Sequence, residues 1–504
     1  MPDAVRFNKE KEEIMKKLLI LLTALSLAET LFAEEAACWI YTEEGKDHNS
    51  IGYGYISDGV WKLYAKRNAK NSLDLYVSAS GGEFYGDETK VYPVNLTNIS
   101  NSDGSEKYTA KKFGRFTHRY ANSLLYNYKE RLSEFIAPDC VSLEGGNNNG
   151  YNFAGCTSLT NVVLNAGLAE FPSAAFSGCS SLADISPRTF TSCEKLYGEA
   201  FNGCSKLVGK FDFPVCVSVV NDVFSSCKLM EEVSIPSATS IGTAAFKNCA
   251  SLSKVVVSQN LTQIGSSAFY GCVNLEPDFL QSILTKSIQH VGSEDVSKKG
   301  SEFYGCTSLK TLVWNLPNLA TNVVNASCFS GCSSLEEVIF KTPIVEFKTL
   351  SLYNLKPGAE IYMHKNVPVS VMPRAFSRNR DLPPYTKVFL SDNIDEWLEV
   401  IGRYHHIIRK ENFSDTSYTY TAPLMSCNTT AKCQTKNWQT LVNLMAKDTD
   451  ICQSTKSGAN VTSVRMTEKG KGVVAFVLCH TGNHEESCFW IFRAPQKGFS
   501  ISVR

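Results

Sequence analysis

The chain has 504 residues, and its 50 lysine and arginine residues balance its 50 aspartate and glutamate residues, so its formal net charge is zero. Such a chain lacks the broad basic surface that binds nucleic acid or an anionic membrane, and we expect no nucleic-acid partner. The length predicts several domains.

The first predicted element is a secretory signal peptide. Met15-Lys16-Lys17 precedes an apolar run from Leu18 to Ala28, and Ala33 provides a small residue near its end. A positive start, a short apolar core and a small exit residue are typical of a cleaved signal, and the run is too short to span a bilayer. We place the true start at Met15 within a leader of residues 1–33. We therefore expect a secreted or cell-surface protein, or a periplasmic one, with no membrane span.

Residues 38–130 are predicted to form a small β-rich domain. Apolar and polar residues alternate over Val60–Ala65 and Leu73–Val77, and glycine and asparagine residues separate such stretches. This pattern is typical of short strands joined by turns. We expect this domain to shield one end of the unit that follows it.

Residues 131–390 carry a recurring motif of Phe, two residues, Cys, two residues and Leu. Phe153, Cys156 and Leu159 form the first copy. Further copies begin at Phe176, Phe190, Phe201, Phe224, Phe246, Phe269, Phe303 and Phe329, and in the copy at Phe224 the Leu position is taken by Met230. Where nothing is inserted, the copies are about 23 residues apart, and a fixed period of this length predicts a solenoid. In a solenoid, each coil buries its apolar side against its neighbours.

Each coil also contains a short predicted strand. In a representative coil, Val233 and Ile235 alternate with polar residues and are expected to face inward, and Pro236 ends the strand because it has no N–H to donate. Ile241 is a second inward residue, and Gly242 after it is expected to let the chain turn. Stacked coils would align these strands into a ladder over a continuous core.

The period has three departures. The 34-residue step from Phe269 to Phe303 predicts an inserted loop within Gln281–Gly300, and an extra copy at Phe190 divides a 25-residue step. In the last copy Asn379 takes the place of Cys. Terminal coils are expected to be atypical because they cap the stack.

This repeat resembles the BspA-like leucine-rich repeat family, over roughly residues 132–390. The resemblance rests on the frame Ile-x-x-x-Ala-Phe-x-x-Cys-x-x-Leu, which Ile241–Leu252 shows in full. It implies a leucine-rich repeat solenoid, a ladder of β-strands with loops or short helices, here flanked by small β-rich domains. It also implies an adhesin-like recognition module of a bacterial surface, which binds a protein or glycan without catalysis or cofactor.

Nine of the 18 cysteines share the Cys position of the motif. Equivalent positions stack along a solenoid, so these thiols are predicted to be buried and unpaired, because free cysteine packs as a small hydrophobic residue. Nothing near them in the sequence lowers their pKa. Cys140 and Cys216 share a second position, which Ala238 occupies in a sister repeat, and they too are expected to pack in the core.

The strand residues that point away from the core are the predicted binding site. They are Val163, Ser186, Ser234, Val256, Val313 and Ile339. Beside them lie Asn161, Asp184, Glu232, Lys254, Thr311 and Glu337. An apolar stripe with a polar rim suits a protein ligand. The alternatives are that β-branched residues merely favour strands, or that an end domain covers the stripe.

Residues 391–410 are predicted to contain a capping helix and a linker. Ser391 or Asp392 caps a helix that ends at Gly402, after a final strand at Tyr385–Leu390. The predicted apolar face consists of Ile394, Trp397, Leu398 and Ile401.

Residues 411–504 are predicted to form a C-terminal β-rich domain of unknown family. Val473–Leu478 and Phe489–Phe492 are the expected strands of a hairpin. Cys479 and Cys488 lie between them and are candidates for a disulfide, which suits an exported protein. With His480 and His484 they also have a spacing compatible with zinc, and a third interpretation leaves all four unpaired. We favour the disulfide and expect no metal.

No motif typical of catalysis stands out. A nucleophile needs a base beside it, and His405-His406 lies near no nucleophile elbow, phosphate-binding loop or carboxylate pair. We therefore predict a protein that is not an enzyme. Two other functions stay open: an enzyme with its active site in residues 413–504, and a self-associating structural protein of the envelope.

Overall fold

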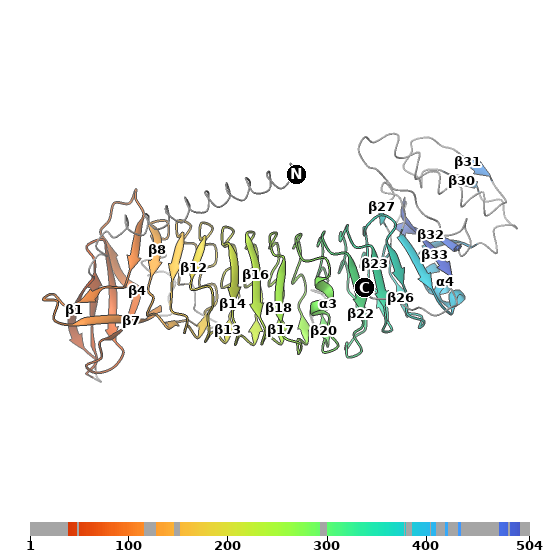
Figure 1. Cartoon of the computed structure of the whole chain (residues 1–504). Coiled ribbons are helices and arrows are strands. Elements are labelled where there is room, and N and C mark those ends of the chain that lie inside the picture. Colours follow the sequence, from red (N-terminus) through yellow and green to blue (C-terminus); the bar gives the residue numbers. More distant parts are fainter. Residues whose placement is uncertain are drawn as a thin grey trace, which may run out of the picture.

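The computed structural model describes residues 39–47, 50–114, 128–145, 152–292, 300–376, 378–379, 386–403, 405–409, 419–421, 432–434, 473–481 and 484–493. These parts form an elongated rod of stacked coils, with a β-barrel at the N-terminal end and a hairpin at the other (Figure 1). The predicted leader lies outside the described residues. Among the residues that are described, no helix is both long and apolar enough to cross a membrane.

The N-terminal β-rich region is a closed barrel. Its strands are β1 (Trp39–Lys46), β2 (Gly52–Ser57), β3 (Trp61–Arg67), β4 (Asp74–Phe84), β6 (Ile99–Ser100) and β7 (Lys107–Gly114). Neighbours pair in the order β4-β3-β2-β1-β6-β7, and β7 also pairs with β4, which closes the sheet. Trp61, Leu63 and Ala65 are fully buried in alternation with polar residues, because successive side chains of a strand point to opposite faces.

The barrel continues into the solenoid without a break in the core. β5 (Tyr92–Asn95) pairs in parallel with β8 (Leu132–Ile136), and β7 pairs with β9 (Ser142–Leu143). The ring of Phe113 in β7 stacks on that of Phe153, with 5.4 Å between centroids. The barrel therefore covers the open end of the first coil.

Two sets of parallel strands run along the solenoid, one more than the single strand in each coil that the sequence predicted. Ladder A has three segments: β5, β8, β10 (Asn161–Val163) and β12 (Asp184–Ser186); β14 (Gly209–Asp212), β16 (Met230–Ile235) and β18 (Lys254–Val257); and β21 (Thr311–Trp314), β23 (Glu337–Phe340), β25 (Glu360–Tyr362) and β28 (Thr386–Leu390). Figure 1 shows these strands side by side along the rod.

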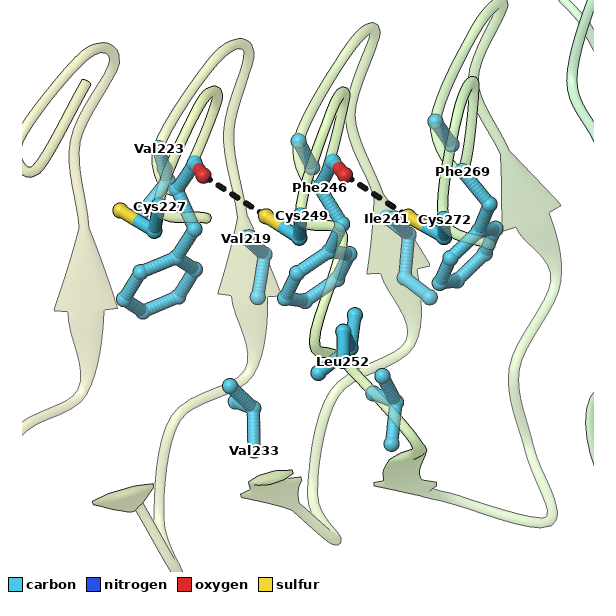
Figure 2. Packing of buried hydrophobic residues seen from close by; sticks show 14 of the residues in the cluster. Val219, Val223, Cys227, Val233, Ile241, Phe246, Cys249, Leu252, Phe269 and Cys272 are labelled. Atoms are coloured by element: carbon cyan, nitrogen blue, oxygen red, sulfur yellow. Dashed lines mark hydrogen bonds between the residues drawn. The ribbon is translucent and has the colours of Figure 1, made fainter. Parts of the chain in front are cut away.

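Ladder B consists of shorter strands, one from each coil. They are β11 (Glu170–Phe171), β13 (Lys195–Leu196), β15 (Ser218–Val219), β17 (Ser240–Ile241), β19 (Gln263–Ile264) and β20 (His290–Val291), followed by β22 (Val323–Val324), β24 (Glu346–Phe347) and β26 (Ser370–Val371). The inward residues of both ladders, such as Val233 and Ile241, face the same core (Figure 2).

The phenylalanines of the motif form one continuous stack, the anchor row. From Phe153 to Phe329, successive rings have centroids 5.0–5.6 Å apart and planes within 10° of parallel. Figure 2 shows Phe246 and Phe269 of this row. The predicted register of the coils is confirmed.

The thiols of the motif form a second row beside the rings. In seven successive coils from Cys179 to Cys332, the sulfur donates a hydrogen bond of 2.9–3.2 Å to the carbonyl oxygen of the preceding coil's anchor phenylalanine. Figure 2 shows two of these bonds, from Cys249 and Cys272. Each described thiol of the solenoid is buried and unpaired, as predicted.

The copy at Phe190 is not an anchor copy, and this part of the prediction was wrong. The ring of Phe190 stacks on Phe213, at 5.7 Å, outside the anchor row. The sulfur of Cys193 donates within its own coil to the carbonyl of Lys195, as that of Cys216 does to Ser218. Eight cysteines, not nine, therefore share the anchor position. The structure has one coil of 25 residues where the sequence predicted a divided step.

The long step after Phe269 replaces a strand of ladder A. Pro277, which has no N–H to donate, and the short helix α3 (Phe279–Ile283) stand where the strand of this coil is expected. The carbonyl of Pro277 still accepts a bond of 3.0 Å from Lys310 N–H. The predicted insertion is thus partly helical, and its residues 293–299 lie outside the described residues.

Gly242 has a different role from the one predicted. Its φ is not positive, and no left-handed turn requires it. A Cβ atom here would lie 2.5 Å from the carbonyl carbon of Val220 in the preceding coil. The same holds for Gly265 against Gly242. Glycine is needed because the backbones of adjacent coils approach closely.

The C-terminal end adds a helix and a hairpin. Helix α4 (Ile394–Gly402) buries its predicted apolar face, but its N-cap is Asn393 and not Ser391 or Asp392. The remaining strands are β27 (Arg378–Asn379), β29 (His405–Arg409), β30 (Thr419–Thr421), β31 (Lys432–Gln434), β32 (Val473–Thr481) and β33 (His484–Arg493). β33 pairs in parallel with β28, so the hairpin extends ladder A beyond the last coil.

Candidate binding surface

The predicted outward residues of ladder A lie in register across neighbouring strands. We call the following set the outward row: Ile136, Val163 and Ser186; Asp212, Ser234 and Val256; and Val313, Ile339, Tyr362 and Phe389. The row has three segments because ladder A is interrupted after β12 and after β18. The six predicted residues thus do not form one stripe, but each lies beside at least one other.

Solvent reaches most of the outward row only partly. Val163, Ser234, Val256 and Val313 are half-buried. Ile339 is buried, with 6% of its surface exposed, although it lies outside the main core cluster. A partner would therefore gain apolar contact mainly on either side of Ile339.

A second row of mostly polar residues lies two positions earlier on the same face. We call it the polar row: Glu134, Asn161 and Asp184; Lys210, Glu232 and Lys254; and Thr311, Glu337, Glu360 and Lys387. Lys210 pairs with Glu232 at 2.7 Å, and Lys387 pairs with Glu360 at 2.9 Å. The predicted polar rim is thus also aligned along the ladder.

The last segment of the outward row ends in two aromatic residues. The rings of Tyr362 and Phe389 stack with 4.8 Å between centroids, and Phe389 stacks on Phe492 of β33 at 5.2 Å. The hydroxyl of Tyr362 donates to Glu360 at 2.7 Å. Burial, as the larger cause, and this hydrogen bond both raise the pKa of Tyr362. The phenol therefore stays protonated as a donor.

A pocket of about 450 Å³ opens at the start of this segment. Thr311, Glu337 and Glu360 from three adjacent strands line it, together with Glu336 and the turn at Lys356–Ala359. We call it the acidic pocket. Lys356 pairs with Glu336. Burial first, and then the carboxylates of Glu360 and Glu336, raise the pKa of Glu337, which has no cationic partner among the described residues.

Ladder B carries an exposed apolar row that the sequence prediction missed. Val217, Val345 and Val369 are 48%, 44% and 66% exposed. Each of these valines lies two residues before a buried residue of ladder B. The only sequence signal for this row was therefore an apolar-polar-apolar pattern over three residues. Its valines are separated by polar residues in several coils, such as Thr239 and Thr262.

The candidate chemistry of the C-terminal hairpin stays a prediction. The backbone of Cys479 pairs with Ser487 and that of Cys488 with Leu478. Both strands are longer than predicted, because β32 runs to Thr481 and β33 begins at His484. The side chains of Cys479, His480, His484 and Cys488 lie outside the described residues. Among those described, no three His, Cys, Asp or Glu residues are grouped so as to hold a metal ion.

The sequence prediction also missed Tyr362, Phe389 and Glu360. Glu360 and Tyr362 keep the spacing of the other coils, because each lies 23 residues after its neighbour, Glu337 or Ile339. This coil has Leu352, Leu355 and Gly358 in place of the Phe, Cys and Leu of the motif, so the motif did not reveal it. Phe389 lies in a strand that was predicted, and alternation along Thr386–Leu390 was a sufficient signal.

Three solved structures illustrate the proteins to which the chain is similar. A leucine rich cell surface protein from Faecalibacterium prausnitzii is 19% identical, with 60% of this chain and 94% of that chain covered and a TM-score of 0.30. A leucine-rich repeat protein from Bacteroides ovatus is 17% identical, with 71% and 96% covered and a TM-score of 0.32. The pneumococcal vaccine antigen PcpA is 12% identical, with 72% and 96% covered and a TM-score of 0.27. No curated protein matches the chain.

The repeat itself matches a family model. The model of the BspA type leucine rich repeat region matches in six copies, over residues 147–276, 217–356 and 285–382. The matched residues are the coils that stack in register through the anchor row and the two ladders. Residues 147–382 of this chain therefore belong to the BspA-type leucine-rich repeat family.

Proposed function

We propose that this chain is an exported recognition protein that binds a protein or glycan partner through the outward face of ladder A, without catalysis. The observation that carries the proposal is the alignment of the outward row and the polar row on neighbouring strands. Partly exposed apolar residues beside charged ones are the composition of an interface. A rigid solenoid also presents such a surface with little ordering cost on binding.

The test compares substitutions on the two ladders. Val256→Asp and Val313→Asp place a charge on the outward row of ladder A, and Val217→Asp places one on the exposed row of ladder B. Wild type and variants are used as bait for envelope and host-cell extracts, with circular dichroism as a check of folding. We expect both ladder A variants to lose the partner that wild type and Val217→Asp retain. Capture that both ladder A variants retain would remove the proposal.

Export is a separate part of the proposal. Its support is the signal-like sequence from Met15 to Ala33. Expression of the gene in its own host, followed by N-terminal sequencing of the protein from medium and surface fractions, tests it. A mature N-terminus close after Ala33 is expected, and an intact leader on cytosolic protein would contradict it.

A further inference from the structure

The acidic pocket contains a carboxylate whose charge the fold leaves uncompensated. Glu337 on β23 and Glu360 on β25 occupy directly paired positions. Like charges at such positions repel each other and destabilise the sheet. Lys387 compensates Glu360 at 2.9 Å, and Lys356 compensates Glu336. Among the described residues Glu337 has no such partner, and burial, followed by the carboxylates of Glu360 and Glu336, raises its pKa.

An apolar platform lies directly beside this pocket on the same face. Ile339 and Tyr362 follow Glu337 and Glu360 by two residues on their strands, a distance of about 6.6 Å. The stacked rings of Tyr362 and Phe389 extend the platform across the next strand. Aromatic rings also attract cations and the aliphatic stems of long basic side chains.

From this juxtaposition we propose that the acidic pocket and its aromatic platform bind an extended protein segment that carries a lysine or arginine residue near an apolar residue. The basic side chain enters the pocket and pairs with Glu337, while the apolar side chain covers Tyr362 and Phe389. The pocket's volume of about 450 Å³ lies within the range of sites that hold small ligands, so a long side chain has room there. This inference rests on the proposed function and specifies the partner's chemistry.

Charge complementarity favours this occupant over a neutral glycan. A sugar can stack on Tyr362 and Phe389, but it brings no positive charge to Glu337 and leaves its repulsion from Glu360 in place. A basic side chain removes that repulsion and gains a partly desolvated ion pair, which is stronger than an exposed one. The exposed valines of ladder B are a weaker candidate, because nothing in the structure indicates what would cover them.

The test uses the full mature chain and a display library of random linear peptides. We expect the selected peptides to carry lysine or arginine within two positions of an aromatic or aliphatic residue. Synthetic copies should lose about tenfold in affinity for Glu337→Gln. Glu134→Gln, the matched carboxylate of the polar row in the first segment, should bind them like wild type. Thermal melts of the two variants confirm that each is folded.

Three results would overturn the inference: no enrichment, enrichment without basic residues, or peptides that bind Glu337→Gln like wild type. Capture of the natural partner that survives Glu337→Gln but fails for Tyr362→Ser would indicate a neutral glycan, and also overturns it. In each case the proposed function still stands if Val256→Asp abolishes that capture. If Val256→Asp and Val313→Asp have no effect either, both proposals fail.

Discussion

The anchor row and the outward row are built by the same coils but obey different constraints. Inside, a phenylalanine recurs in every coil from Phe153 to Phe329, because each ring packs between the rings before and after it. Outside, the corresponding residue changes from Val163 through Ser234 to Tyr362. The interior therefore sets the register of the strands, and the surface is left free to vary along the rod.

This difference explains how one repeat can support a local binding site. A close-packed interior tolerates few changes of volume, whereas an outward side chain contacts only its neighbours on the sheet. The acidic pocket and its aromatic platform occur where the outward residues become large and the polar row becomes acidic. Under the proposed function, we expect binding specificity to depend on position along the rod.

The sharpest test of the comparison removes one ring from the interior. Phe246→Ala should lower the free energy of unfolding by about 3–5 kcal/mol, because the fully buried ring stacks on both Phe224 and Phe269. Val256→Ala, on the outward row of the next coil, should cost about 1 kcal/mol or less. Urea unfolding followed by circular dichroism measures both, and equal losses would mean that the inward and outward faces are misassigned.

A second test uses the chemistry of the thiols. Burial raises the pKa of Cys156, Cys272 and Cys332 to about 12. Roughly one such thiol in 10⁴ is then ionised at pH 8, and the thiolate is the reactive form. We expect the 12 described thiols to react with a disulfide reagent only after denaturation. Rapid labelling of these cysteines in the native protein, located by mass spectrometry, would contradict the buried row.

A third test addresses Glu302, the one acidic residue among the described residues that directly precede an anchor phenylalanine. Alanine holds the same position in the two preceding coils, as Ala245 and Ala268. Glu302 is fully buried and accepts a hydrogen bond of 3.1 Å from the side chain of Asn325. Burial raises its pKa in the folded state. Its contribution to stability is therefore present at low pH and is lost as the pH rises through the raised pKa.

Glu302→Gln should remove this pH dependence. The variant should melt at a higher temperature than wild type at pH 8, and the difference should shrink toward pH 4. Glu134→Gln, on the exposed polar row, serves as the control and should show no such gain. A wild type whose advantage over Glu302→Gln grows with pH would show that the carboxylate is stabilised as an anion.

The smallest expected effect concerns the backbone that connects the rows. Ala244 adopts a left-handed conformation with φ of 53°, which only glycine adopts without strain. Ala244→Gly should leave stability unchanged or raise it by up to about 1 kcal/mol. Ala245→Gly, at the next and fully buried position, should lower stability. Opposite signs in thermal melts are expected, and a clear loss for Ala244→Gly would contradict this account.

Part of the candidate site could be predicted because it depends on a spacing within one coil. Val163, Ser234, Val256 and Val313 follow from the distance between the Leu position of the motif and the next strand, and the structure places each beside another residue of the outward row. The pocket could not be predicted in this way. It needs Thr311, Glu337 and Glu360 from three coils, and the coil of Glu360 lacks the Phe, Cys and Leu of the motif.

The local pattern alone determined the solenoid, the inward phenylalanines and thiols, and the helix over Ile394–Gly402, because these features depend on side-chain period within short windows. Only the tertiary structure decided which segments become neighbours. It closed the N-terminal barrel through the pairing of β4 with β7 and joined β33 to ladder A. It also placed Cys193 in the same position of its coil as Cys216, and not beside an anchor phenylalanine. Strand pairing across long stretches of sequence depends on how whole coils stack, and no single segment encodes it.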